Sequence, residues 1–241
     1  MRIAAIVPAH NEARNLPLLA EAFRAHAPAC DVVVVDDGSS DDTARVAGSL
    51  GWSVLRLPMN LGIGGAVQSG YLWAWERGYD VAVQIDGDGQ HDPAFLEALL
   101  APIEVGRADV VIGSRFLADG GFRSTAVRRA GITYLSWFLR LRCGARVTDP
   151  TSGFRAANRE AIELFARYYP SDYPEPEAVA LARRAGLRIA EVPVRMRDRA
   201  HGRSSIDPLS TLYYLVKVSL SLVLLPPRTD GGPEGVTEVT P

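Results

Sequence analysis

Short apolar runs alternate with amphipathic segments over the first 115 residues. The runs lie at 2–7, 32–35, 53–57, 81–85 and 110–115. Each is short and nearly continuous in apolar residues, as buried parallel strands are. Between them apolar residues recur at helical spacing, for example Leu16, Leu19 and Phe23. This alternation predicts right-handed βαβ units and a mostly parallel, Rossmann-like α/β sheet flanked by helices.

The pattern changes after residue 115. A helix with Ile132, Leu135 and Leu139 on one side is predicted first. A polar loop at 148–155 follows, with a helix after it, then an acidic stretch containing Asp172, Glu175 and Glu177 before another helix. A last strand covers 188–193. We predict one catalytic domain over 1–205, with a nucleotide-binding half at 1–115 and an acceptor half at 116–205.

Residues 206–225 form a largely apolar segment that Asp207 and Lys217 interrupt and Pro226 ends. This favours an amphipathic helix at a membrane surface or a docking site over a bilayer span. A helix that closes the core or pairs with a second copy stays open, so a homo-oligomer is a further possible partner state. Residues 226–241, rich in Gly, Pro and Thr, are predicted to be disordered.

Charge divides the chain more sharply than the net value of −2 suggests. Residues 1–114 carry 7 Arg and 15 Asp or Glu, whereas residues 115–203 carry 17 Arg and 9 acids. The split is compatible with two halves that attract each other. It also suits an acidic, metal-loading half and a basic half that meets an anionic substrate or lipid head groups.

Several classes of protein lack support in the sequence. There is no P-loop, no complete dinucleotide fingerprint and no zinc spacing of histidines, and no motif indicates binding to nucleic acid. The first residues, 1–8, are too short an apolar run for a signal peptide. Two distant cysteines, Cys30 and Cys143, indicate a reducing compartment. We expect a cytoplasmic protein, peripheral on the inner face of the cell membrane.

Two carboxylates one residue apart, Asp86 and Asp88, follow the apolar run at 81–85. Ligands of open α/β sheets bind at the carboxyl ends of strands. Mg²⁺ is typically held by one or two carboxylates together with substrate phosphates. The stretch therefore predicts a divalent-cation site for a diphosphate, although an Asp/Gly turn alone would look the same.

Seven motifs in order resemble a family 2 glycosyltransferase of the GT-A fold, in its polyprenyl-phosphate subgroup, which includes dolichyl-phosphate mannose synthases. The motifs are Pro8-Ala9-His10-Asn11-Glu12, Val35-Asp36-Asp37-Gly38-Ser39, Asn60-Leu61-Gly62, Asp86-Gly87-Asp88-Gly89-Gln90-His91, Gly113-Ser114-Arg115, Asp149-Pro150-Thr151-Ser152-Gly153-Phe154-Arg155 and Glu191-Val192-Pro193-Val194. The resemblance covers about residues 3–206 and implies transfer of a hexose from a GDP- or UDP-sugar to a polyprenyl phosphate.

The resemblance also implies roles for individual residues. A nucleoside pocket would be lined by Pro8, His10, Glu12, Val35 and Asp37. Mg²⁺ or Mn²⁺ would be held by Asp86, Asp88 and Gln90, with Gly87 between them. For Asp36 and Asp37 a turn or helix cap remains an alternative, and His91 is expected to pack in its loop rather than to bind metal.

The resemblance also implies roles for residues from Arg115 onward. Arg115 and Arg199 would neutralise the leaving diphosphate. In the last motif Ser205 stands where the mannose synthases have lysine, so Arg203 is a candidate substitute. Asp149 could orient the sugar or the acceptor, act as a base, or only form a turn.

Two other functions stay open. Transfer to a saccharide hydroxyl needs a general base, which the acids at 172–177 could supply. A nucleotide-sugar binding protein without catalysis would bind a donor and release no product.

Overall fold

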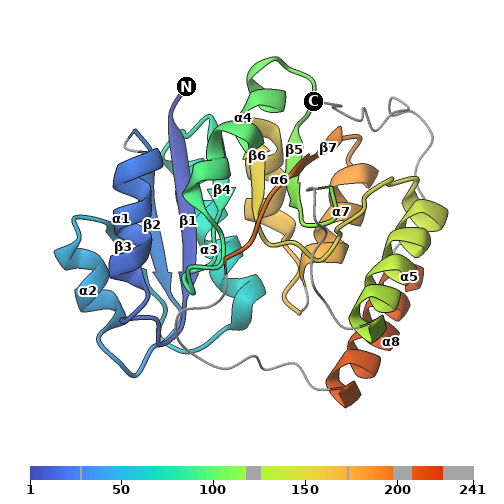
Figure 1. Cartoon of the computed structure of the whole chain (residues 1–241), viewed down its shortest axis with the longest axis horizontal. Coiled ribbons are helices and arrows are strands. Elements are labelled where there is room, and N and C mark those ends of the chain that lie inside the picture. The colour runs from blue at the N-terminus through green and yellow to red at the C-terminus, as the bar shows by residue number, and fades with distance from the viewer. Residues whose placement is uncertain (28, 118–125, 173, 198–207, 225–241) are drawn as a thin grey trace.

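The computed structural model describes residues 1–27, 29–117, 126–172, 174–197 and 208–224. In these ranges seven strands form one sheet in the order β3-β2-β1-β4-β6-β5-β7 (Figure 1). The strands are β1 (Ile3–Ala9), β2 (Asp31–Asp36), β3 (Ser53–Arg56), β4 (Val81–Gln84), β5 (Val110–Ser114), β6 (Arg155–Asn158) and β7 (Ile189–Pro193). All neighbouring strands are parallel except where β6 pairs with β4 and β5. The predicted α/β class and mostly parallel sheet are confirmed.

Helices cover both faces of the sheet. The helical elements are α1 (Leu16–His26), α2 (Thr43–Ser49), α3 (Gly62–Glu76), the 3₁₀ turn η1 (Pro93–Phe95), α4 (Leu96–Glu104), α5 (Ala126–Cys143), α6 (Arg159–Tyr168), α7 (Pro174–Arg184) and α8 (Pro208–Leu224). One core layer lies between the sheet and α1, α2 and α4. The other lies beneath α3, α5, α6, α7 and α8. The continuous apolar strands of the sequence therefore reflect burial on both faces.

The sequence analysis missed one strand. The helix expected after the loop at 148–155 is present as α6, but β6 comes before it at Arg155–Asn158 and runs antiparallel between β4 and β5. Its sequence, Arg-Ala-Ala-Asn, lacks the β-branched and aromatic residues that are enriched in strands. Pairing on both sides, with Ala156 opposite Val83 and Val111, makes it a strand.

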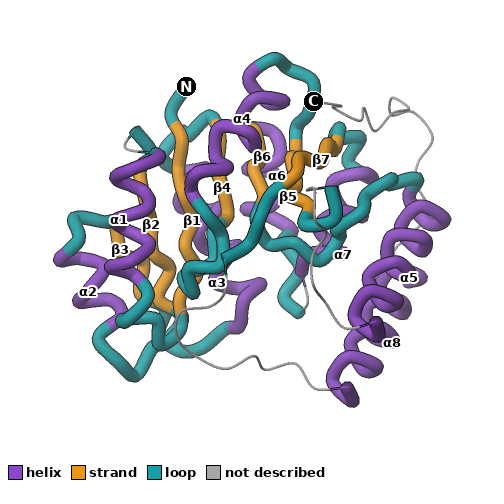
Figure 2. The backbone as a smooth tube through the Cα atoms, viewed as in Figure 1, coloured by secondary structure: helices purple, strands orange, loops and turns teal. Residues whose placement is uncertain are grey.

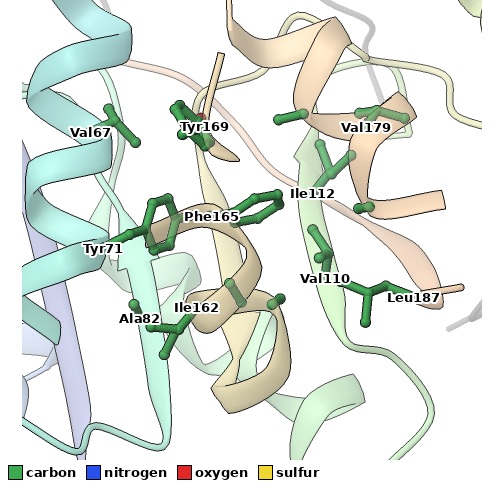
Figure 3. Packing of buried hydrophobic residues seen from close by; sticks show 14 of the residues in the cluster. Val67, Tyr71, Ala82, Val110, Ile112, Ile162, Phe165, Tyr169, Val179 and Leu187 are labelled. Carbon is green, nitrogen blue, oxygen red and sulfur yellow. The ribbon is translucent and has the colours of Figure 1, made fainter. Parts of the chain in front are cut away.

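An aromatic cluster joins α3 to α6. Tyr71 of α3 lies 5.1 Å from Phe165 of α6 and 5.5 Å from Tyr169, measured between ring centroids (Figure 3). Each such pair contributes roughly 0.5–1.5 kcal/mol beyond area burial.

At the start of α3 a Cβ on Gly64 would lie 2.2 Å from the Ser171 carbonyl oxygen, so only glycine fits. The segment leading to α7 is thus packed closely against the start of α3.

The C-terminal helix predicted at 206–225 is present as α8. It packs along α5, and the two helices lie side by side at the margin of the molecule (Figure 2). Arg142 of α5 donates to the Val223 carbonyl oxygen, 3.1 Å away. No helix within the described ranges is long and apolar enough to cross a membrane.

Candidate active site

The sequence motifs meet at one edge of the sheet. Strands β1, β2, β4, β5 and β7 are parallel, so the loops that follow them leave from the same edge. Because β6 is antiparallel, the loop that precedes it, at 148–154, reaches this edge too. In the register, Arg155 at the start of β6 pairs with Gln84 at the end of β4. The fold therefore places the 148–154 loop beside the Asp86 loop.

Asp37 stabilises the start of a helix. Its buried carboxylate accepts hydrogen bonds from the backbone N–H groups of Leu61, at 2.6 Å, and Gly62, at 3.0 Å. These donors belong to the first turn of α3, where backbone N–H groups lack helical partners. Asp37 thus caps α3, the alternative that the sequence left open, and its contact with a nucleoside stays a prediction.

The other residues predicted for the nucleoside lie at or just after the carboxyl ends of β1 and β2. Pro8 and Val35 are paired neighbours in β1 and β2. The exposed His10 ring has Nδ1 2.9 Å from the Asp37 carbonyl oxygen, to which it can donate. Glu12 is half-buried and accepts a 2.5 Å hydrogen bond from the Asn15 amide. The exposed His10 ring and the Glu12 carboxylate therefore both lie just after the end of β1.

The loop after β4 presents oxygen atoms. Asp86 is partly exposed, at 37% of its side chain, and its Oδ1 is buried without a hydrogen-bond partner among the described residues. Asp88 is 6% exposed, and its Oδ1 accepts from the Gln90 N–H at 3.0 Å. A Cβ on Gly87 would lie 3.0 Å from the Pro8 carbonyl oxygen, which explains the glycine. The loop therefore packs directly on the end of β1.

This donor set fits a hard divalent cation. Carboxylate and amide oxygens from Asp86, Asp88 and Gln90 are the ligand type that Mg²⁺ and Mn²⁺ prefer, and Asp86 Oδ1 is an oxygen whose lone pairs are not engaged. Among the described residues no group of three or more His, Cys, Asp or Glu side chains could enclose a metal ion. The loop is accordingly suited to share an ion with phosphate oxygens.

Arg115, just after β5, and Asp149, in the loop before β6, form a buried ion pair. Arg115 donates from Nε to Asp149 Oδ2 and from a terminal nitrogen to Oδ1, both at 2.6 Å. Asp149 is fully buried, and its Oδ2 also accepts from the Arg115 backbone N–H. Such bidentate geometry fixes both groups. Asp149 is therefore placed to orient Arg115, while any contact of these two residues with a ligand stays a prediction.

Glu191 holds the loop that carries Asp149. Its carboxylate accepts from the backbone N–H groups of Thr148, at 2.7 Å, and Asp149, at 2.9 Å. Burial raises the pKa of the Glu191 carboxyl, while these hydrogen bonds oppose the rise. The sequence had identified the Glu191 motif without this role, because its partners lie more than 40 residues away.

The three acids predicted as an alternative base lie in different environments. Asp172 is exposed and pairs with Lys217 at 2.5 Å. Burial raises the pKa of Glu177, which interacts with Ser221. Burial also raises the pKa of Glu175, where the Arg155 charge lowers it and the Asp86 charge raises it further. Of the three, Glu175 is the acid whose carboxyl is coupled to Asp86.

Arg155 connects the loop at 148–154 to the first turn of α7. It is 1% exposed and donates to the carbonyl oxygens of Ser152, Pro150 and Glu175 at 2.7, 2.8 and 2.7 Å. The sequence had included Arg155 only as the end of a motif, and nothing in its neighbours indicated these acceptors. The predicted diphosphate residues Arg199 and Arg203 lie outside the described residues.

A cavity of about 380 Å³ adjoins the loop on the side of α1. It is lined by Asn15, Leu18, Leu19, Glu21, Ala22, Asp88, Gly89, His91, Pro93 and Arg197. Asp88 thus borders open space even though little of its own surface is exposed.

Comparison with known proteins gives the same family. The model for glycosyl transferase family 2 matches residues 4–165. Undecaprenyl-phosphate mannosyltransferase of Micrococcus luteus is 36% identical over 216 residues, 86% of this chain and 88% of that protein. Polyprenol monophosphomannose synthase of Mycolicibacterium smegmatis is 32% identical over 228 residues, 90% of this chain and 86% of that protein.

A solved structure shares the fold. It is glucosyl-3-phosphoglycerate synthase from Mycobacterium tuberculosis with Mn²⁺, UDP-glucose and phosphoglyceric acid, similar with a TM-score of 0.66 at 24% identity over 92% of this chain and 78% of that one. The family model covers well over half of the chain. Both relatives exceed 30% identity over most of its length. The chain therefore belongs to glycosyl transferase family 2 and is a glycosyltransferase.

Proposed function

We propose that the chain is a metal-dependent, inverting transferase that moves a hexose from a nucleotide-diphosphate sugar to a polyprenyl phosphate. The observation that carries this proposal is the pair Asp86 and Asp88 at the same sheet edge as the Arg115–Asp149 ion pair. The relatives named for polyprenyl-phosphate substrates support the acceptor. The Mn²⁺ and UDP-glucose bound by the solved neighbour support the donor and the ion.

Asp86, Asp88 and Gln90 would hold the cation. When bound, Mg²⁺ or Mn²⁺ neutralises charge that develops on the departing nucleoside diphosphate. Pro8, His10, Glu12, Val35 and Asp37 would form the nucleoside pocket around the ends of β1 and β2. The ordered start of α3, capped by Asp37, keeps the backbone of this pocket in place before the donor binds.

The acceptor phosphate needs positioning more than proton transfer. A phosphate monoester is already mostly ionised at neutral pH, so its oxygen can attack the anomeric carbon as the bond to the diphosphate breaks, with inversion. Both Asp149 oxygens already accept from Arg115. Asp149 would therefore hold the Arg115 guanidinium in position to bind phosphate oxygens, and it would not serve as a base.

Membrane contact would come from the outer faces of α5 and α8. Exposed apolar side chains on these faces are Tyr134, Trp137 and Leu141 of α5 and Val216, Leu220, Val223 and Leu224 of α8. The exposed Arg129, Arg140 and Arg142 accompany them on α5. Apolar and aromatic groups flanked by arginine are typical of surfaces that lie at an anionic bilayer. This arrangement supports peripheral association with the cytoplasmic face.

A second candidate function is transfer to a saccharide hydroxyl, which requires a base. It is favoured by Glu175, whose raised pKa and coupling to Asp86 suit a proton acceptor near the donor site. In that reaction Glu175→Gln would abolish transfer. With a polyprenyl phosphate acceptor the same variant would keep most activity.

The test is incubation of the purified chain with GDP- and UDP-hexoses, undecaprenyl phosphate and Mg²⁺ or Mn²⁺. We expect nucleotide release that needs both the lipid phosphate and the cation, and loss of release in EDTA. Release with a saccharide instead of the lipid would favour the second function. If the chain bound the donor but released no nucleotide in any of these incubations, both candidate functions would be overturned.

A further inference from the structure

Both ring nitrogen atoms of His91 face a single residue, Asp86. The ring is 2% exposed, and Nδ1 accepts a 3.0 Å hydrogen bond from the Asp86 backbone N–H. Because Nδ1 is the acceptor, the neutral ring carries its proton on Nε2. Nε2 lies 3.7 Å from Asp86 Oδ2. One imidazole thus contacts both the backbone and the carboxylate side of Asp86.

The ring has little freedom to move. It stacks on Phe154, with centroids 4.9 Å apart and planes 11° from parallel. Phe154 is itself 1% exposed, in the loop that the antiparallel β6 brings to this edge. The backbone of His91 also forms an isolated β-bridge with Met196. Aromatic stacking and the backbone bridge together fix the direction in which Nδ1 and Nε2 point.

Gly153 lies against the Asp86 carboxylate and the Gln84 amide. A Cβ at this position would lie 3.4 and 3.5 Å from the two Asp86 carboxylate oxygens, at ordinary contact distance, and 3.1 Å from Gln84 Nε2. The contact with Gln84 is tighter than ordinary, so a methyl group would push the amide, which lies beside the carboxylate, by a few tenths of an ångström. Gln84 is fully buried, and its Oε1 accepts from the Tyr169 hydroxyl, so it cannot move outward freely.

We infer that His91 is a positioning residue for the metal-binding carboxylate of Asp86, and that Gly153 leaves the room that the Gln84 amide needs beside that carboxylate. A separation of 3.7 Å is longer than a hydrogen bond. The ring therefore restricts rotation of the carboxylate and leaves its lone pairs available for the cation. The inference rests on the proposed function, in which Asp86 binds the ion.

The chemistry of His91 separates this role from simple packing. Phenylalanine would retain the stack on Phe154 but could neither accept from the Asp86 N–H nor face Oδ2 with a donor. Asparagine places a carbonyl oxygen near the position of Nδ1, so it can accept from the Asp86 N–H. A packing role predicts that phenylalanine is the better replacement, whereas a positioning role predicts that asparagine is.

The experiment measures binding of Mn²⁺ in the presence of UDP or GDP, from the electron paramagnetic resonance signal of free Mn²⁺. We expect His91→Phe to weaken binding by about 10- to 100-fold, the usual cost of removing a group that orients a metal ligand. His91→Asn should bind several-fold more tightly than His91→Phe. His26→Phe, at an exposed position in α1, is the matched control and should bind like the wild type.

Gly153→Ala provides a second route if His91→Phe does not fold. It should weaken Mn²⁺ binding, whereas Gly48→Ala, whose Cβ would meet nothing within 4 Å, should not. Wild-type affinity in both folded His91→Phe and Gly153→Ala would overturn the inference and leave the proposed function standing. If the wild type itself bound no Mn²⁺ with either nucleotide, the metal assignment in the proposed function would fall, and the inference with it.

Discussion

The two halves of the catalytic edge hold their charged groups by different means. In the nucleotide-binding half, Asp37 and Asp88 accept from backbone N–H groups. Where the two halves meet, Arg115 at the end of the first half is held by Asp149 of the second, and the loop of Asp149 is held by Glu191. Backbone donors leave a carboxylate with its negative charge and spare lone pairs, which suits a cation. Ion pairs hold an arginine in place within a buried region.

The difference explains why the first half is easier to recognise. Asp88 and its donor at Gln90 are two residues apart, so the arrangement is contained in a short motif. The partners Arg115 and Asp149 are 34 residues apart, and Asp149 and Glu191 are 42 apart. We expect substitutions in the first half to affect chemistry most, and those in the second to affect chemistry and folding together.

The largest expected effect is that of Asp88→Asn. Asparagine can still accept from the Gln90 N–H, so the loop should keep its shape, but it lacks the charge that binds the cation. We expect nucleotide release to fall by about 10²- to 10³-fold, as for loss of one group that stabilises developing charge, with an unchanged unfolding temperature. Asp42→Asn, at the exposed N-cap position of α2, is the control. Near wild-type turnover for Asp88→Asn would contradict the metal site.

Asp149→Ala should lower the free energy of unfolding through its effect on the acceptor half. It leaves Arg115 buried without its carboxylate, which typically costs about 3–5 kcal/mol of stability. Urea denaturation gives the change in free energy of unfolding. Arg115→Met combined with Asp149→Leu should recover much of that stability while transfer stays lost. A stability loss in Asp149→Ala no larger than that of the exposed variant Asp42→Ala would show that the ion pair is not a constraint on this half.

Trp137→Glu should weaken membrane contact without changing the donor site. Trp137 is 57% exposed on α5, and its partial burial in lipid would contribute roughly 1.5 kcal/mol, about tenfold in binding. Co-sedimentation with vesicles containing anionic phosphatidylglycerol measures the change. Val105→Ser, 65% exposed at the end of α4, is the control in the other half. Equal binding of both variants would exclude the α5–α8 face.

The smallest expected effect is a pH dependence from Glu191. Burial raises its pKa from the usual 4.5 in the folded state, so folding favours the protonated carboxyl. The stability that this group contributes is present below about pH 4.5 and is lost as pH rises through the folded pKa. Compared with Glu191→Gln, the wild type should therefore lose relative stability as pH rises above 4.5, in parallel urea titrations. A wild type that gains stability relative to Glu191→Gln as pH rises would contradict the burial argument.

Much of the nucleotide-binding half could be predicted from local sequence. The apolar runs at 32–35 and 81–85 correspond to β2 and β4 within a residue or so at each end. Strand ends in a parallel sheet share an edge, so the motifs after them were expected to meet. The same reasoning could not find β6, because Arg155–Asn158 has no strand pattern of its own.

The sequence by itself determined the α/β class, the family and the acidic loop of Asp86 and Asp88, because short-range patterns encode strands, turns and metal-ligand spacing. Only the tertiary structure decided that Gly153 lies against Asp86, that Phe154 stacks on His91, that Arg155 joins the 148–154 loop to α7 and that Glu175 differs from Asp172. These arrangements depend on the direction of β6 and on partners many residues away. Hydrogen bonds, burial and stacking across such distances are set by packing, which no local pattern records.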